Sequence, residues 1–384
     1  MARSSFTASP VRIKVCGLGG GGSNAITRMV RDGVVGVEFI AMNTDAQSLA
    51  ITEAPVRIQL GEKLVKGLGA GGDHHVGQKA AEENRDEIKE VLSGADMIFL
   101  TAGMGGGTGT GAAPVVAEIA RGSGALTIAV VTKPFGFEGN HRMKVAEEGV
   151  QNLLGKVDTL IIIPNERLFT LCDQKTGVDT AFRMADEVLC HGVQAIAQVI
   201  TTPGLINLDF ADVRSIMKDA GPAWMSIGHG SGQNRAVDAA KNALASPLLD
   251  VEITGAKGVL FNVIGGDNLS LFEVNEAAEI IKQAVDPDAN IIFGVVHDSR
   301  MDKDVKITLV ATGFQANQMG NAPIRAEEMA EYLKDLKNEE QLDVPAFLRR
   351  PMYAARKMPA PQPQQAPAQT SRTARPPAYN PWSR

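Results

Sequence analysis

The chain has 384 residues, of which 44% are hydrophobic and 21% charged, so it can bury a sizeable core and is not disordered throughout. Its net charge of −6 is unevenly spread, because residues 349–384 carry seven basic side chains and no acidic one, which leaves −13 on residues 1–348. An acidic body argues against a general nucleic-acid-binding protein. No apolar run approaches the length of a membrane span, the first ten residues do not resemble a signal segment, and three cysteines lack metal-ligand spacing. These features predict a cytoplasmic protein without a disulfide framework.

Short apolar segments alternate with longer helical ones from residue 11, which is typical of an α/β domain with a mostly parallel sheet. Helices are predicted after the first and third strands, one ending near residue 31 and one over 112–121. The predicted strands of this part, in chain order, span 12–16, 36–42, 97–100, 126–131 and 159–163.

A long segment over 178–200 keeps apolar residues at helical spacing, and its broad apolar face predicts a helix buried between two parts of the fold. A second α/β unit follows, with helices over 212–218 and 271–284 and strands over 258–264, 290–296 and 306–312. The predicted organisation is a leader (1–10), a first α/β domain (11–177), a central helix (178–203), a second α/β domain (204–315), a linker (316–341), an apolar-basic peptide (342–350) and a disordered, basic, Pro-rich tail (351–384).

The first of two glycine-rich loops, GLGGGG over 17–22, follows the first strand. Gly17, Gly19 and Gly22 match GxGxxG, in which glycines let backbone N–H groups approach a pyrophosphate at a helix N-terminus. Asp45, at the end of the second strand, is placed to contact a ribose. This loop alone is compatible with a dinucleotide-binding dehydrogenase or with a tight strand-helix turn that binds nothing.

The second loop, over 101–111, contains six glycines and follows a buried strand. Its glycines suggest close approach to an anion or unusual backbone angles, and Thr108 and Thr110 add hydroxyls for phosphate oxygens or a metal ion. Both loops are expected at the carboxyl edge of one sheet, and two such loops suit a triphosphate better than a dinucleotide. No GxxxxGK[ST] motif is present, so the protein is not a P-loop NTPase.

Five motifs together resemble the tubulin/FtsZ family of GTPases, in its bacterial cell-division branch. They are GLGGGGSNA (17–25), NTDAQ (43–47), GMGGGTGTG (103–111), TKPFGFEG (132–139) and NLDFADV (207–213). The resemblance implies a tubulin-like α/β fold, with a Rossmann-like GTP-binding domain joined by a long core helix to a smaller α/β domain.

The resemblance also implies which residues contact the nucleotide. The phosphates would be wrapped by Gly20, Gly21, Gly22, Ser23, Asn24, Gly107, Thr108 and Gly109. Glu138 and Arg142 would contact the sugar or phosphates, although their spacing alone is equally that of a surface ion pair. The ligand would be GTP or GDP with Mg²⁺, and a role for K⁺ stays open.

For the base, the resemblance points to Phe182, Asp186 and Asn165. An aromatic ring can stack on a base, while a carboxylate accepts from guanine N1–H and the exocyclic amine, which predicts GTP over ATP. Asn165 is placed for the sugar or the base edge. Without the resemblance, Phe182 and Asp186 would be a core aromatic beside an exposed acid.

Asn207, Asp209 and Asp212 are the catalytic residues that the resemblance implies. They would meet the GTP of the next subunit, position its attacking water and help to hold a cation. Hydrolysis would then be coupled to head-to-tail polymerisation, in a filament that builds the division ring at midcell. Read locally, Asp209 is a helix N-cap with Asp212 at the third helical position.

Residues 342–350 (LDVPAFLRR), from Leu342 to Arg350, resemble the peptide that docks on membrane-tethering and regulatory division proteins in this family. The linker before it is shorter than is usual in the family, and the basic tail after it is longer and could supply a membrane contact. Trp224 and His229 are atypical for a predicted loop and have no functional interpretation from the sequence. A GTP-binding scaffold that does not hydrolyse GTP is a further alternative to the dehydrogenase.

Overall fold

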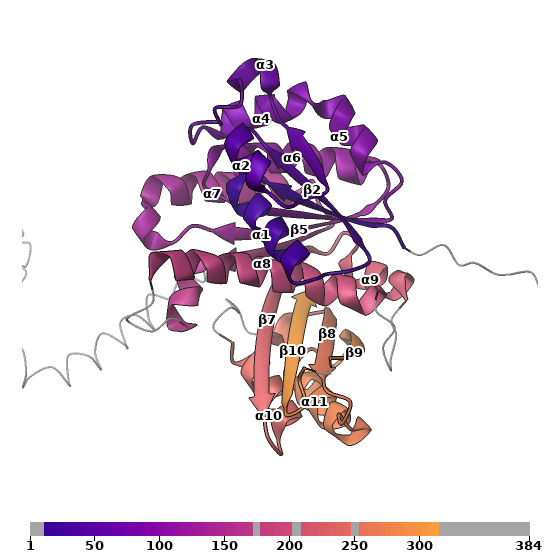
Figure 1. Ribbon diagram of the computed structural model, residues 1–384. Helices are drawn as coiled ribbons and strands as arrows, with labels where there is room; N and C mark the ends of the chain where they lie inside the picture. The colour runs from indigo at the N-terminus through magenta and orange to yellow at the C-terminus, as the bar shows by residue number, and fades with distance from the viewer. Residues whose placement is uncertain (1–10, 172–176, 202–208, 247–252, 299, 315–384) are drawn as a thin grey trace, which may run out of the picture. The chain divides into compact units, whose positions relative to one another are not determined.

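The computed structural model describes residues 11–171, 177–201, 209–246, 253–298 and 300–314, which all belong to one compact unit. Within these residues, ten strands form one continuous sheet in the order β3-β2-β1-β4-β5-β6-β7-β10-β8-β9 (Figure 1). The sheet passes from the first domain into the second because β6 pairs in parallel with β7 through three residue pairs.

The first domain contributes the parallel part of this sheet, with its strands in the doubly wound order 3-2-1-4-5-6. The predicted strands are present, and each extends one to three residues further toward its carboxyl end. A short edge strand, β3, escaped prediction because half of its side chains are exposed and it carries no apolar run. The strands are β1 (Ile13–Leu18), β2 (Val37–Asn43), β3 (Val56–Gln59), β4 (Met97–Gly103), β5 (Leu126–Lys133) and β6 (Thr159–Pro164).

Helices follow nearly every strand of this domain. The expected helix over 112–121 begins five residues earlier, inside the second glycine-rich loop, for a packing reason given below. The helices are α1 (Gly19–Arg31), α2 (Ala46–Ile51), α3 (Glu62–Val65), α4 (His74–Glu83), α5 (Arg85–Leu92), α6 (Gly107–Gly122), η1 (Gly136–Glu138), α7 (Asn140–Leu154) and η2 (Asn165–Leu171).

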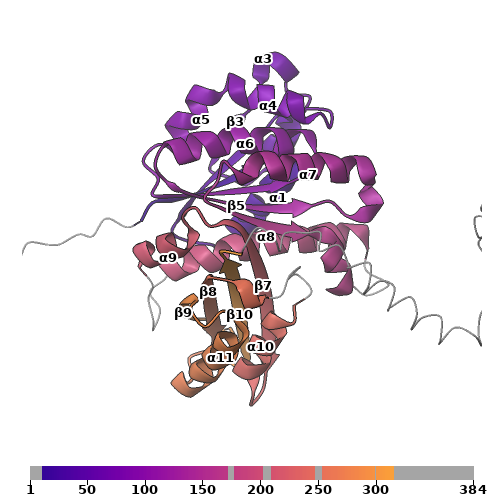
Figure 2. The same ribbon diagram turned by 180° about the vertical axis from the view of Figure 1, so that it is seen from behind.

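Both faces of the parallel strands are buried. Along the strands, side chains alternate between two clusters: Val15 and Val130 pack with α1 on one face, whereas Cys16 and Val131 pack with α5, α6 and α7 on the other. Helices α5, α6 and α7 are in view together in Figure 2. Strands covered on both faces read as continuous apolar runs, which is why the sequence located them well.

The long helix α8 (Val178–Thr201) lies between the two domains, as its apolar face predicts (Figure 1). Val193 and Ile196 belong to the same buried cluster as Val130 of β5 and as Leu260 and Val310 of the second domain. A single helix therefore packs against both parts of the sheet.

The second domain is a mixed sheet rather than a mostly parallel one. Strand β10 runs antiparallel to both of its neighbours, β7 and β8, and β8 pairs in parallel with β9. Helices α10 and α11 share a separate core with β8, β9 and β10. The elements are α9 (Phe210–Met217), β7 (Gly221–Ser231), α10 (Arg235–Leu244), η3 (Ile253–Gly255), β8 (Gly258–Gly265), α11 (Leu271–Ala284), β9 (Asn290–His297) and β10 (Asp304–Thr312).

Trp224 and His229 lie in strand β7, so the expectation of a loop there was wrong. Two glycines of this strand are required by helix packing. A Cβ on Gly228 would lie 2.0 Å from the carbonyl oxygen of Ala239, and one on Gly230 would lie 2.0 Å from that of Arg235. Because α10 rests directly on this strand, only glycine fits at both positions.

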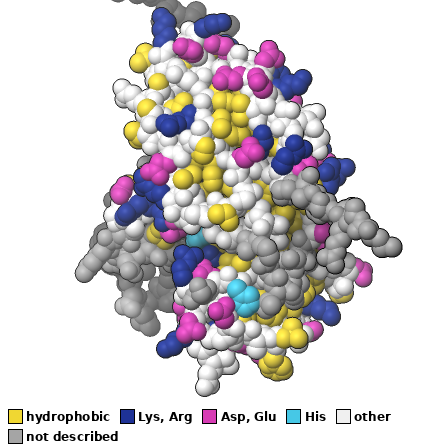
Figure 3. Space-filling model, turned by 45° about the vertical axis from the view of Figure 1, so that its right-hand side comes forward, with side chains coloured by type: hydrophobic (Ala, Val, Ile, Leu, Met, Phe, Trp, Pro, Cys, Tyr) yellow, Lys and Arg dark blue, Asp and Glu magenta, His cyan; other side chains and the backbone are white. Residues whose placement is uncertain are grey.

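The surface carries charges of both signs. On the face seen in Figure 3, acidic and basic side chains are interspersed, and the described residues on that face form no extended basic surface. No helix among the described residues is long and apolar enough to cross a membrane.

Candidate functional site

The two glycine-rich loops meet where the strand order of the sheet reverses. Strands β1 and β4 are parallel neighbours, with Leu18 opposite Ala102, and α1 and α6 start directly beyond their carboxyl ends. Their helix N-termini both present unpaired backbone N–H groups and a positive partial charge at this edge. Such a switch point is the usual place for a ligand in an open α/β sheet.

A cavity of about 400 Å³ lies at this edge. It is lined by both loops and by residues from η1, α7, η2 and α8, which come from five stretches of the sequence. The residues expected to contact the nucleotide that line this cavity are Gly20, Gly21, Asn24, Gly107, Thr108, Gly109, Glu138, Arg142, Asn165, Phe182 and Asp186. The structure therefore brings most of the predicted binding residues to one place.

Gly22 and Ser23 do not line the cavity. A Cβ on Gly22 would lie 2.4 Å from the carbonyl oxygen of Thr101, so this glycine is required for the close approach of α1 to β4. The Ser23 side chain is 1% exposed, and its hydroxyl has no hydrogen-bond partner among the described residues. Neither residue is therefore at the cavity wall with the other residues predicted to wrap the phosphates.

The glycines of the second loop serve two purposes, of which sequence reasoning recognised only one. A Cβ on Gly111 would lie 2.0 Å from the carbonyl oxygen of His74, and one on Gly77 would lie 2.2 Å from that of Gly107, so α4 and α6 cross in backbone contact. In contrast, Gly106 of this loop and Gly20 of the first loop line the cavity, and a Cβ at either position would meet no atom within 4 Å. Helix packing explains why α6 begins inside the loop.

The two threonines of this loop have different environments. Thr108 lines the cavity, and its hydroxyl oxygen lies 2.6 Å from that of Thr44 at the end of β2. Thr110 is buried, does not line the cavity and accepts a hydrogen bond from the backbone N–H of Gly105 at 2.9 Å. Only Thr108 is therefore placed to bind a phosphate or a metal-bound ligand, and the expectation for Thr110 was wrong.

Glu138 and Arg142 form the ion pair that their spacing predicts, and both also line the cavity. The Glu138 carboxylate additionally accepts from the backbone N–H of Phe135 at 2.9 Å. Glu138 is therefore held in place from two sides, while the Arg142 side chain stays half exposed at the cavity wall.

Phe182, Asp186 and Asn165 also line the cavity. The Phe182 ring packs edge-on against the rings of Phe135 and Phe137, with centroids 5.4 Å and 6.1 Å away, so it is an open part of an aromatic cluster rather than a core residue. Burial raises the pKa of Asp186 to about 7, against the opposing charge of Arg28.

Asn165 provides a test of whether a polar ligand fits here. It is 4% exposed, and its side-chain oxygen is buried without a hydrogen-bond partner among the described residues. A buried acceptor without a donor is unfavourable unless a ligand or water supplies one. The residue pattern thus fits a ligand that carries donors, such as the hydroxyls of a ribose.

Asp209 and Asp212 lie away from this cavity. Asp209 is the N-cap of α9, where its carboxylate accepts from the backbone N–H of Asp212 at 2.8 Å, as its local pattern predicts. Phe182 and Asp186 lie in the first half of α8, whereas α9 follows its end, and the 15 residues from Asp186 to the end of the helix span about 23 Å. Neither aspartate lines the cavity of its own chain, and Asn207 lies outside the described residues.

Asp45 is not placed for the role that the dehydrogenase interpretation gives it. Its carboxylate caps α2 by accepting from the backbone N–H groups of Gln47 and Ser48, and it does not line the cavity. The acidic residue that should bind a ribose in that interpretation is therefore already engaged.

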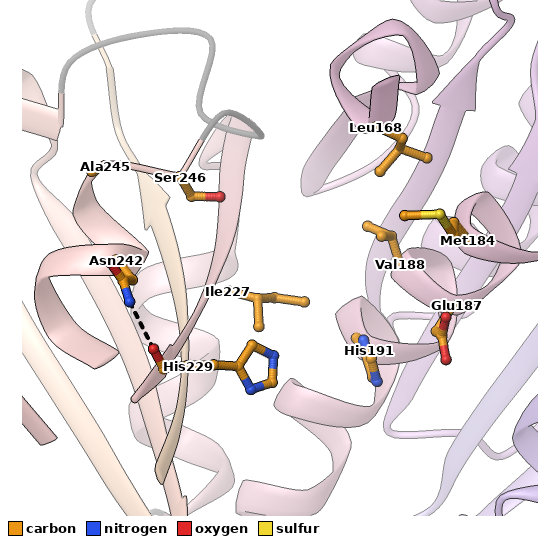
Figure 4. A pocket seen from close by; sticks show the side chains of 10 residues that line it. All are labelled: Leu168, Met184, Glu187, Val188, His191, Ile227, His229, Asn242, Ala245 and Ser246. Carbon is orange, nitrogen blue, oxygen red and sulfur yellow. Dashed lines mark hydrogen bonds between the residues drawn. The ribbon is translucent and has the colours of Figure 1, made fainter. Parts of the chain in front are cut away.

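Another cavity, of about 470 Å³, separates α8 from β7 and α10 (Figure 4). His191 of α8 and His229 of β7 project into it from opposite sides, together with apolar side chains such as Met184 and Ile227. Burial lowers the pKa of His191 to about 3, and the nearby charge of Lys306 acts in the same direction. His229, for which the sequence analysis found no function, therefore lines the same cavity as His191.

The described residues contain no group of three or more His, Cys, Asp or Glu side chains that could hold a metal ion. Cys190 and His191 are adjacent on α8, and the Cys190 thiol contacts Asp32. His74 and His75 lie in the first turn of α4, with their rings 4.1 Å apart. A resident metal centre built from these side chains is not present in this part of the chain.

Comparisons with known proteins add to this geometry. Residues 12–173 match the family model for the GTPase domain of the tubulin/FtsZ family, and residues 221–315 match the model for the C-terminal domain of the FtsZ family. These two ranges flank the central helix and contain all the cavity residues except those on α8.

Solved structures of FtsZ from M. jannaschii are similar to this chain. An empty FtsZ dimer is 46% identical, with a TM-score of 0.79, and the match covers 81% of this chain and 90% of that one. A tryptophan-to-tyrosine mutant is 47% identical, with a TM-score of 0.78 and coverage of 80% and 92%. A GTPγS-bound protofilament of CetZ2 from Haloferax volcanii is 18% identical, with a TM-score of 0.68 and coverage of 85% and 99%, and shows a likeness of fold.

Proposed function

Because this chain belongs to the tubulin/FtsZ family of GTPases and is an FtsZ-type protein, we propose that it binds and hydrolyses GTP and assembles head to tail into filaments. The observation that carries the proposal is the cavity at the sheet switch point, where two helix N-termini and two glycine-rich loops face residues suited to a guanine base. The fold contains no P-loop lysine, so backbone groups must carry most of the phosphate binding.

The triphosphate would lie on the two loops. Gly20, Gly106 and Gly107 line the cavity, where their backbone N–H groups would bind phosphate oxygens, and Thr108 supplies a hydroxyl that Thr44 holds in orientation. Mg²⁺ would be bound mainly through phosphate oxygens and this hydroxyl, where it would offset the phosphate charge. Whether K⁺ also contributes is left open.

The base and the sugar would lie toward α8. Phe182 offers an exposed ring for stacking, and Asp186 an acceptor for guanine N1–H and the exocyclic amine. Asn165 offers its unpaired oxygen to the ribose or the base edge. Adenine has no donor at N1, so we expect preference for GTP over ATP.

Hydrolysis would require a second subunit. Asn207, Asp209 and Asp212 would enter the GTP cavity of the neighbouring subunit, where the carboxylates position and polarise the attacking water. This arrangement is supported by the separation of Asp209 and Asp212 from the cavity of their own chain, at the far end of α8. A head-to-tail contact of this kind does not close and generates a filament.

In the cell, we expect such filaments to form the cytoplasmic division ring at midcell. The peptide over 342–350, which lies outside the described residues, would dock on membrane-tethering and regulatory division proteins through Phe347, Leu348 and its two arginines. The basic tail over 351–384 would add a weak membrane contact, and no nucleic-acid partner is expected.

The test is phosphate release from GTP as a function of protein concentration, with light scattering recorded on the same samples. We expect turnover per subunit to be near zero at low concentration and to rise together with scattering. Constant turnover per subunit without scattering would contradict a shared site, no turnover with bound GTP would indicate a non-hydrolysing scaffold, and NAD binding in place of GTP would indicate a dehydrogenase.

Mixing two variants sharpens this test. Asp212→Ala should bind GTP without hydrolysing it, and Gly20→Arg should be unable to bind GTP while keeping its own Asp212. If the site is shared, mixing the two inactive variants should restore part of the turnover, because one subunit supplies GTP and the other supplies Asp212. Asp238→Ala, which removes an aspartate from the first turn of α10, is the control and should keep full turnover.

A further inference from the structure

Asp186 lies on the wall between two adjoining cavities. With Asn24 and Phe182, it lines both the nucleotide cavity and a neighbouring cavity of about 450 Å³. Arg28 of α1 lines only the second of these. Arg28 and Asp186 therefore share the second cavity, which does not include the two glycine-rich loops.

Arg28 is anchored beside Asp186 but is not fully engaged. Its Nη2 donates to Glu187 Oε1 at 2.8 Å, and Glu187 directly follows Asp186 on α8. Its Nε is buried, has no hydrogen-bond partner among the described residues, and lies 3.9 Å from Asp32 Oδ2. The ion pair with Glu187 joins α1, which follows the first glycine-rich loop, to the first half of α8.

The charge of Arg28 opposes the effect of burial on Asp186. Burial raises the pKa of this carboxyl to about 7, and Arg28 is the group that lowers it. No hydrogen bond to the carboxylate occurs within the described part of the chain. The charged groups that face this region are Arg28, Arg31 and Asp32 on α1, Asp179, Arg183 and Glu187 on α8, and Glu138 and Arg142 across the nucleotide cavity.

The protonation state of this carboxyl determines which base it matches. An ionised carboxylate offers two acceptors, which match the N1–H and amino donors of guanine. A protonated carboxyl offers one donor and one acceptor, which match the N1 acceptor and the 6-amino donor of adenine. A group that titrates near neutral pH can therefore change base preference without any change in shape.

We propose that Arg28 is a positioning residue that sets base specificity by favouring the ionised form of the Asp186 carboxylate from the far side of the cavity wall. This inference rests on the proposed function, in which Asp186 binds the base of the nucleotide. Arg28 acts through Asp186 and does not itself line the nucleotide cavity.

The test measures the dissociation constants of GTP and ATP by calorimetry between pH 6 and 8.5, for the wild type, Arg28→Gln, Arg28→Lys and Asp186→Asn. The readout is the ratio of the GTP and ATP dissociation constants. Ionisation of the triphosphate changes both constants equally, so its effect cancels in the ratio. The wild type should prefer GTP less as the pH falls. Arg28→Gln should lower the preference at pH 7 by about tenfold and move the midpoint of the profile up by about one pH unit.

Two variants separate this effect from a structural one. Arg28→Lys keeps the charge and should restore most of the wild-type profile, whereas Asp186→Asn cannot titrate and should give a flat one. Arg31→Gln, one turn along α1 and paired with the exposed Glu53, is the matched control and should leave the ratio unchanged.

The possible failures are distinguishable. If Arg28→Gln weakens GTP and ATP equally with no change in the pH profile, Arg28 only supports the fold and the inference is wrong, while the proposed function stands. If the wild type itself has no preference for GTP at any pH, the assignment of Asp186 to the base is wrong, and the proposed function fails with it.

Discussion

The hydroxyl oxygens of Thr44 and Thr108 lie 2.6 Å apart, and this hydrogen bond joins the end of β2 to the first turn of α6. Both residues lie in motifs that resemble the tubulin/FtsZ family, but nothing in these motifs predicts that their side chains touch. The contact orients the Thr108 hydroxyl, which faces the proposed triphosphate. A residue at the end of β2 therefore sets the geometry of the glycine-rich loop that follows β4.

Thr108→Val should weaken GTP binding by about tenfold and Thr44→Val by about threefold, because the first removes a ligand group and the second removes only its orientation. Calorimetry with GTP measures both effects. Thr52→Val, which loses a hydroxyl bonded to the backbone of α2 outside the cavity, is the control and should leave affinity unchanged. Equal losses of GTP affinity in Thr44→Val and Thr108→Val would contradict the assignment of Thr108 as the ligand group and Thr44 as the residue that orients it.

Gly111→Ala should lower the free energy of unfolding by about 3 kcal/mol, because the added methyl group would meet the backbone of α4. Gly122→Ala, at the other end of the same helix, would meet no atom within 4 Å and should be neutral or raise stability by up to about 1 kcal/mol. Urea unfolding of the two variants makes the comparison. A small effect at Gly111 would mean that α4 and α6 can move apart.

Gly20→Ala should change stability and binding in opposite directions. The position is helical and open, so alanine should stabilise α1 by up to about 1 kcal/mol, while its methyl group would occupy the proposed phosphate site and weaken GTP binding at least tenfold. Gly155→Ala, also in open space but outside the cavity, should leave GTP binding unchanged. Full GTP affinity in Gly20→Ala would place the phosphates elsewhere.

Acid should destabilise the protein in part through His191. Burial lowers the pKa of His191 to about 3, below the ordinary value of 6.5, so the unfolded chain takes up this proton first and stability is lost as the pH falls from 6.5 toward 3. His191→Gln should reduce the loss between pH 7.5 and 5 by about 1–2 kcal/mol in urea unfolding.

His75→Gln, at an exposed position on α4, is the control for the acid effect and should lose as much stability as the wild type. The same loss in His191→Gln would mean that other groups account for the acid dependence. A gain in stability at both pH values would point to packing in the cavity of Figure 4 rather than to titration.

The sequence by itself determined the fold class and indicated most of the predicted site residues that line one cavity. Doubly buried strands leave continuous apolar runs, the central helix leaves an unbroken helical period, and a phosphate loop leaves clustered glycines, so each is readable from neighbouring residues. Gly20, Thr108 and Asp186, predicted from motifs and resemblance, line one cavity at the expected edge of the sheet.

Only the tertiary structure decided which residue of a motif does what. Gly111 and Gly228 look like loop glycines in the sequence, but each is required by a helix that lies in backbone contact with it. Asp45 and Thr110 have side chains suited to a ligand but use them on their own backbone surroundings. These roles depend on contacts with residues from other helices and strands. The chemistry of a residue and of its neighbours in the sequence does not specify which distant residue will contact it in the fold.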